Sequence, residues 1–109
     1  MTVELLYLPG CANHRATVDL VQSVLQAECM PAEFQEIPIR DYAEANAHDF
    51  PGSPTIRVNG QDIENVSSPQ LDVGFACRTY FVDGKPQGVP PRSWLEQAIR
   101  AARNQESRR

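Results

Sequence analysis

The chain has 109 residues, of which 41% are hydrophobic and 22% are charged, and this composition suits one globular domain with a single core. The formal net charge of -4 argues against a nucleic-acid partner, because binding to phosphates depends on clustered Lys and Arg. Apolar runs are only a few residues long, so we expect no membrane span and no signal peptide.

The first half of the chain reads as strand, helix, strand and short helix. Residues 3–8 are short and apolar, which suits a strand buried on both faces. From residue 12 to residue 28, apolar side chains recur at steps of three and four, which predicts a one-sided helix (12–28). Residues 34–39 alternate apolar and polar side chains and predict a second strand, in which Pro38 restricts the end to a sheet edge. A short helix is expected over residues 42–48.

A hairpin is the strongest local signal in the second half. Residues 55–58 and 61–64 predict two short strands. The pair between them, Asn59-Gly60, tolerates the positive φ angles of a tight turn. We therefore expect these two strands to pair directly.

The rest of the chain is expected to hold an inserted segment and a final helix. Residues 65–90 are less regular and predict the insertion. After Pro90-Pro91, apolar side chains lie on one face of a helix. We expect a single domain over residues 1–103, with a frayed tail at residues 104–109.

Cys11 lies where the first strand gives way to the first helix. Unpaired backbone N–H groups and the positive end of the helix dipole favour a thiolate at such a place, which predicts a reactive nucleophile. His14 stands three residues later, where a C-x-x-C motif would have its second cysteine. It is interpreted either as a thiolate partner or proton donor, or as an exposed polar residue.

The order of elements, with Cys11 at the first junction and Ser53-Pro54-Thr55 opening the hairpin, resembles the thioredoxin fold over nearly the whole chain. The resemblance implies an α/β domain with a central mixed four-stranded sheet flanked by helices. It also implies that Pro54 is cis, lies beside the active cysteine and leaves a backbone edge free for a substrate. An X-Pro bond adopts the cis form for about 0.5 to 1 kcal/mol, so a tight turn can impose it.

A closer resemblance is to small bacterial thioredoxin-like proteins that are often labelled alkylmercury lyase-like. Four short motifs carry it, and they stand in this chain as Pro9-Gly10-Cys11-Ala12-Asn13, Gly52-Ser53-Pro54-Thr55, Cys77-Arg78-Thr79-Tyr80 and Val89-Pro90-Pro91-Arg92. The resemblance implies thiol chemistry or handling of organomercurials.

Three cysteines at distant positions do not make the disulfide framework of a small secreted protein, so we expect a cytoplasmic protein. Cys77 is interpreted as a resolving or metal-binding thiol, or as a small buried hydrophobe. Cys29 is placed about 27 Å from Cys11 by the length of the first helix, too far for a disulfide between them.

Three functions stay open. In the leading one, Cys11 attacks a disulfide, a peroxide or another soft electrophile, and Cys77 or an external thiol resolves the adduct. In the second, Cys11 and Cys77 bind a soft metal ion such as Hg(II) or Cu(I). In the third, the protein is redox-inactive and binds a peptide at the Pro54 edge. No cofactor is expected; the expected partners are a thiol or disulfide substrate or a soft metal ion, with a protein redox partner as a further candidate.

Overall fold

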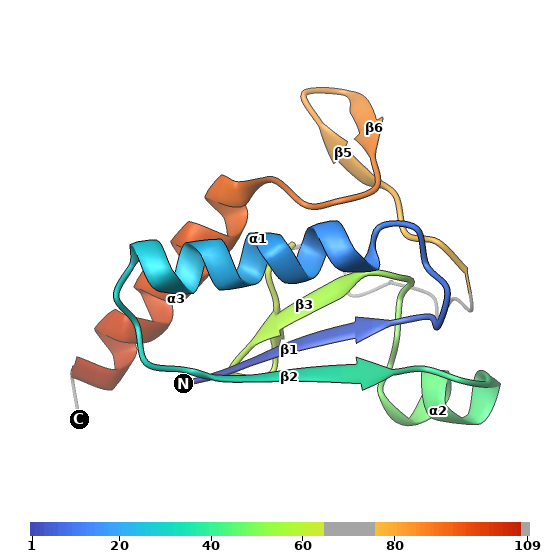
Figure 1. The fold of residues 1–109 in the computed structure, drawn as a ribbon, viewed down its shortest axis with the longest axis horizontal. Helices are drawn as coiled ribbons and strands as arrows, with labels where there is room; N and C mark the ends of the chain where they lie inside the picture. The colour runs from blue at the N-terminus through green and yellow to red at the C-terminus, as the bar shows by residue number, and fades with distance from the viewer. Residues whose placement is uncertain (65–75, 108–109) are drawn as a thin grey trace.

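The computed structural model describes residues 1–64 and 76–107 (Figure 1). In chain order the elements are β1 (Thr2–Tyr7), α1 (His14–Ala27), β2 (Glu33–Pro38), α2 (Tyr42–Ala47), β3 (Thr55–Val58), β4 (Gln61–Asp62), β5 (Tyr80–Val82), β6 (Lys85–Gln87) and α3 (Arg92–Ser107). The main sheet has the order β2-β1-β3-β4, with β1 parallel to β2 and antiparallel to β3. The predicted mixed four-stranded sheet is therefore confirmed, and β2, which contains Pro38, lies at its edge.

The central strand β1 is buried on both faces of the sheet, as its apolar sequence predicted. Leu5 packs in one core cluster with side chains of α1 and α3, and Figure 1 shows these two helices on the same side of the sheet. The next residue, Leu6, packs with Ile39, Ala45 and Phe50 in a second cluster. Consecutive strand residues point to opposite faces, so Ala45 of α2 packs with Leu6 on the other face, and Figure 1 shows α2 near the end of β2.

Helix α1 begins two residues later than predicted because a tight turn precedes it. The Cys11 N–H donates to the carbonyl of Leu8 at 2.9 Å, and Gly10 has a φ of 85°. A glycine with positive φ after a proline is typical of a type II turn. The His14 N–H then donates to the carbonyl of Cys11 at 3.2 Å. Cys11 thus lies in the turn that leads into α1, outside the helix itself.

The predicted hairpin is present, although its second strand is shorter than expected. Asn59 and Gly60 have φ angles of 51° and 83°, as a tight hairpin turn requires. Strand β4 ends at Asp62, whose Oδ1 accepts a hydrogen bond from the Glu64 N–H at 2.9 Å. A local side-chain bond of this kind competes with strand pairing, which explains the early end.

The part of the predicted insertion that the structure describes forms a second hairpin. Strands β5 and β6 pair with each other through a turn at Asp83 and Gly84, and Figure 1 shows this hairpin standing away from the main sheet. The first part of the insertion, 65–75, lies outside the described residues. No helix in residues 1–64 or 76–107 is long and apolar enough to cross a membrane.

Helix α3 continues to Ser107, whereas we expected fraying after Arg103. Two contacts account for the difference. The Glu106 carboxylate lies 3.1 Å from the amino group of Met1, and Arg103 donates to the carbonyl of Glu28 at 3.0 Å. These bonds attach the last turns of the helix to the body of the domain.

Candidate thiol site

The candidate site is arranged around the Ser53-Pro54 turn. The bond between the two residues is cis, as predicted, and both residues are buried. The Leu8 N–H donates to the Ser53 Oγ at 3.0 Å. The carbonyl of Leu8 also accepts a hydrogen bond from the Cys11 N–H, so Leu8 connects the turn that carries Cys11 to Ser53.

The Cys77 segment is attached to the same serine through its backbone. The Ser53 N–H donates to the carbonyl of Ala76 at 2.9 Å, and the Arg78 N–H donates to the carbonyl of Ser53 at 2.8 Å. Ser53 and Cys77 are thereby paired as an isolated parallel bridge. The described part of the insertion therefore pairs with the residue before Pro54.

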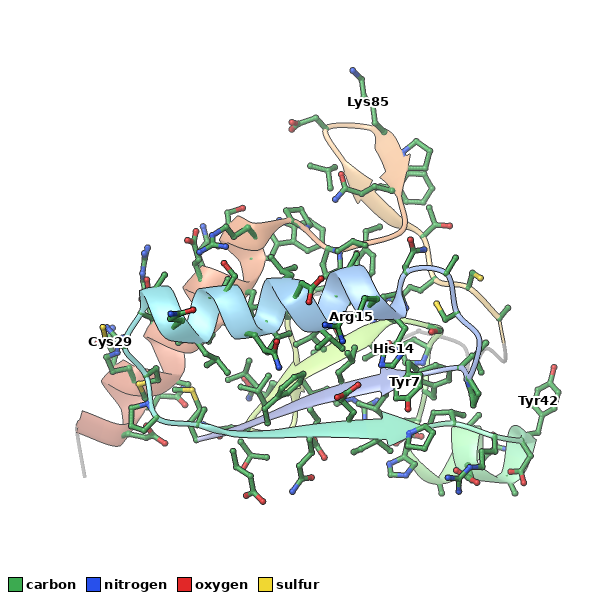
Figure 2. All side chains as sticks on the ribbon, in the orientation of Figure 1. Tyr7, His14, Arg15, Cys29, Tyr42 and Lys85 are labelled. Carbon is green, nitrogen blue, oxygen red and sulfur yellow. The ribbon has the colours of Figure 1, made fainter. Side chains whose placement is uncertain are left out.

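All three cysteines are free thiols, with Cys11 half-buried and Cys29 and Cys77 exposed. The exposure of Cys77 does not fit its interpretation as a buried small hydrophobe. Cys29 lies at the end of α1 remote from His14, as Figure 2 shows. Cys11 and Cys77 are consequently the two thiols whose segments share a neighbour, Ser53.

Arg78 is a buried charged residue with several partners. Its Nη1 donates to Asp62 Oδ2 at 2.7 Å and to Thr55 Oγ1 at 3.0 Å, and its Nη2 donates to Glu64 Oε1 at 2.7 Å. The guanidinium carbon lies 4.7 Å from the centre of the Tyr80 ring. We call Arg78, Asp62, Glu64 and Thr55 the Arg78 cluster.

Electrostatics in the Arg78 cluster favour the charged guanidinium. Burial by itself would lower the pKa of Arg78, but the hydrogen bond with Asp62 and the charges around it outweigh burial and raise this pKa. The side chain is 5% exposed, so both ion pairs are shielded from solvent on the arginine side. Arg78 is therefore a fixed positive charge that anchors the backbone next to Cys77.

Tyr80 fixes the other side of the Ser53-Pro54 turn. Its hydroxyl donates to the carbonyl of Pro54, and its ring meets Trp94 of α3 edge-on, with 6.0 Å between ring centres. The C-R-x-Y motif thus presents Cys77 to solvent and buries Arg78 and Tyr80. In the sequence these two residues stand only as neighbours of Cys77. Their burial depends on contacts with Thr55, Asp62 and Pro54, which no local pattern reveals.

Replacing Tyr80 with phenylalanine is expected to remove an alkaline loss of stability. Burial raises the pKa of Tyr80 above its ordinary value of 10.0. Above about pH 10 the unfolded chain therefore releases a proton that the folded chain keeps, and stability falls by up to about 1.4 kcal/mol per pH unit. Urea unfolding at about pH 8 and about pH 11 should show a smaller decline for Tyr80→Phe than for the wild type.

Tyr42→Phe is the matched control, because Tyr42 is exposed and its replacement should leave the alkaline decline in place. At neutral pH, Tyr80→Phe should lower the free energy of unfolding by about 1 kcal/mol, since the carbonyl of Pro54 loses its donor. If the free energy of unfolding fell equally in the wild type and in Tyr80→Phe as the pH was raised, the buried position of the Tyr80 hydroxyl would be contradicted.

His14 is held by residues that the sequence did not indicate. Its Nε2 lies 2.7 Å from Glu36 Oε1, and its ring stacks on Tyr7 with 3.7 Å between ring centres. Figure 2 labels His14 and Tyr7 side by side. Glu36 and Tyr7 come from neighbouring strands, β2 and β1, so only the sheet register brings them to the start of α1. The ring orientation is fixed by these contacts, and a role for His14 in the chemistry of Cys11 stays a prediction.

Among the residues that the structure describes, no three His, Cys, Asp or Glu side chains are grouped so as to hold a metal ion.

Comparisons with protein-family models, curated proteins and solved structures give no match to this chain.

Proposed function

We propose that this chain is a thioredoxin-like thiol protein in which Cys11 is the nucleophile and Cys77 the resolving thiol. One observation carries the proposal: the Cys11 turn and the Cys77 segment both hydrogen-bond to Ser53. The mixed sheet and the cis Ser53-Pro54 bond are compatible with the fold that the sequence motifs imply.

The proposed reaction with a disulfide has two exchange steps. The Cys11 thiolate attacks one sulfur of the substrate, forms a mixed disulfide and releases the other sulfur as a thiolate. The Cys77 thiolate then attacks the Cys11 sulfur, forms the Cys11–Cys77 disulfide and releases the second substrate thiolate. Two electrons pass from the protein to the substrate, and the protons of the two cysteines end on the released thiols.

A peroxide would follow the same route through a sulfenic acid. The Cys11 thiolate attacks one peroxide oxygen, the O–O bond breaks and the second oxygen leaves as water or an alcohol after protonation. Cys77 then displaces the sulfenic oxygen as water and forms the same disulfide. An external thiol or a protein redox partner returns the two electrons, and we place this chemistry in the cytoplasm, where such thiols are abundant. His14 is the proposed proton donor to the leaving group.

Soft-metal binding is the second candidate, because two thiols whose backbone segments are both bonded to Ser53 also suit Hg(II) or Cu(I). The peptide-binding alternative has less support. The edge at Ser53 was expected to be free for a substrate, but its N–H and its carbonyl are already bonded to residues 76 and 78.

The disulfide chemistry is tested by intact mass and peptide mapping. Reduced protein is treated separately with a small disulfide, with hydrogen peroxide and with Hg(II). Wild type and Cys29→Ser should each become two hydrogen atoms lighter with the first two reagents, through a Cys11–Cys77 bond. Cys77→Ser should stop at an adduct on Cys11, and Cys11→Ser should form no such bond.

Two results would reject the redox proposal. One is a Cys11→Ser variant that is oxidised as fast as the wild type. The other is a wild type that resists the disulfide and the peroxide. If the resistant protein still binds one Hg(II) through both thiols, the soft-metal candidate takes the place of the redox one.

A further inference from the structure

The backbone next to Pro54 is covered by the chain itself. Peptides often bind at the edge of a strand by pairing with main-chain groups that are otherwise free. Here the N–H of Ser53 is bonded to Ala76 and its carbonyl is bonded to Arg78. The segment 76–78, which carries Cys77, therefore occupies the position that an added peptide strand would take.

The covering segment is held by buried interactions as well as by these two backbone bonds. The guanidinium of Arg78 is bonded to Asp62, Glu64 and Thr55, which belong to the hairpin region after Pro54. Gly52 lets the segment approach closely, since a Cβ at this position would lie 2.9 Å from the Cβ of Arg78. An incoming peptide must displace an arginine that is paired with two carboxylates before it can pair with Ser53.

We propose that the Arg78 cluster closes the Ser53 edge against peptides, so that Cys11 reacts with small disulfides and peroxides rather than with a cysteine in an extended peptide. This inference rests on the proposed function. Arg78 acts here as a positioning residue that sets substrate class, because its contacts hold residues 76–78 in place while its side chain stays buried.

The test compares three disulfides with the same leaving group, 2-nitro-5-thiobenzoate, whose release is followed by absorbance. The partners are cysteamine, a ten-residue peptide with a central cysteine, and the same peptide with N-methylated amides beside that cysteine. N-methylation removes main-chain donors and leaves the size of the peptide nearly unchanged. All measurements use the full chain with Cys29→Ser and Cys77→Ser, so that the adduct on Cys11 is not resolved, and mass mapping confirms that Cys11 carries it.

We expect the chain with an unaltered cluster to react at least about tenfold faster with the cysteamine disulfide than with either peptide, and equally with the two peptides, because the peptides form no main-chain bonds at Ser53. Glu64→Gln and Arg78→Lys weaken the cluster. They should raise the rate with the unmethylated peptide severalfold and leave the other two rates unchanged. Glu96→Gln, which alters an exposed ion pair with Arg92, is the matched control.

Hydrogen exchange at the Arg78 amide reports directly whether the segment opens, because that amide is bonded to the carbonyl of Ser53. The Arg78 amide should exchange faster in Glu64→Gln than in the wild type or in Glu96→Gln. If Arg78→Lys fails to fold, Glu64→Gln, in which the arginine keeps its other partners, decides the result. Unchanged exchange in Glu64→Gln would overturn the proposal.

Two further results would also overturn the proposal. One is a chain with an unaltered cluster that reacts equally with the cysteamine and peptide disulfides. The other is faster exchange at Arg78 without a gain for the unmethylated peptide. If Cys11 in the chain with an unaltered cluster reacts with none of the three disulfides, the proposed function itself is rejected, so the two failures are distinct.

Discussion

Arg78→Met is expected to lower the free energy of unfolding by about 3 to 5 kcal/mol, the range typical of removing one partner from a buried ion pair. Methionine retains much of the apolar volume of arginine but donates no hydrogen bonds. Asp62 and Glu64 would then face each other's charge without the guanidinium that now lies 2.7 Å from each. Urea unfolding at neutral pH, followed by circular dichroism, measures the change.

Arg92→Met is the matched control for this prediction. Arg92 pairs with Glu96 on the surface of α3 and is 42% exposed, so its loss should lower the free energy of unfolding by less than about 1 kcal/mol. Asp62→Asn combined with Arg78→Met should recover part of the loss, because one unpaired carboxylate is then removed. Similar losses for Arg78→Met and Arg92→Met would contradict the structural role of the cluster.

The local elements were predictable because their signals lie within a few residues. An apolar run before Pro9-Gly10 predicted β1, and Asn59-Gly60 predicted the hairpin that joins β3 and β4. The ends of elements were less accurate where a neighbouring contact decides them. The turn at Cys11 delays α1, and the bond between Glu106 and the chain's amino group extends α3 beyond the expected end.

The candidate site was predictable in its residues but only partly in its contacts. Cys11, Pro54 and Cys77 stand in short motifs, and a motif is visible in the sequence alone. The partners of Arg78 are between 14 and 23 residues away, on segments whose approach depends on the sheet and the covering segment. His14 likewise meets Glu36 through the pairing of β1 with β2, which no local pattern reveals.

The predicted free edge at Pro54 shows why such long-range contacts matter for function. The resemblance implied an open backbone at this position, and the chain fills that position with its own Cys77 segment. The Gly52-Ser53-Pro54-Thr55 motif therefore predicted the turn. That residues 76–78 occupy the edge beside it depends on the ion pairs of Arg78, which the motif does not contain. In the mechanism proposed above, this difference changes the class of substrate.

Gly52→Ala is expected to lower the free energy of unfolding by about 3 kcal/mol and to loosen the Cys77 segment. Gly52 has a φ of 147°, which L side chains rarely adopt. A Cβ there would also lie 2.9 Å from the Cβ and 3.1 Å from the Cα of Arg78. The backbone of residues 76–78 must move to relieve this contact, and the bonds to Ser53 should weaken as a result.

Gly84→Ala separates backbone strain from the steric contact. Gly84 also has a positive φ, of 78°, but a Cβ added there would meet no atom within 4 Å, so only the strain of about 1 to 2 kcal/mol applies. Denaturant unfolding gives the two stabilities, and hydrogen exchange at the Arg78 amide reports the covering segment. In Gly52→Ala, the Arg78 amide should exchange faster than the lower global stability of the variant explains. In Gly84→Ala, any change in the exchange rate of this amide should match the change in global stability. Equal losses of stability in the two variants, with equal exchange at Arg78, would mean that the close approach of Gly52 does not hold the segment against Ser53.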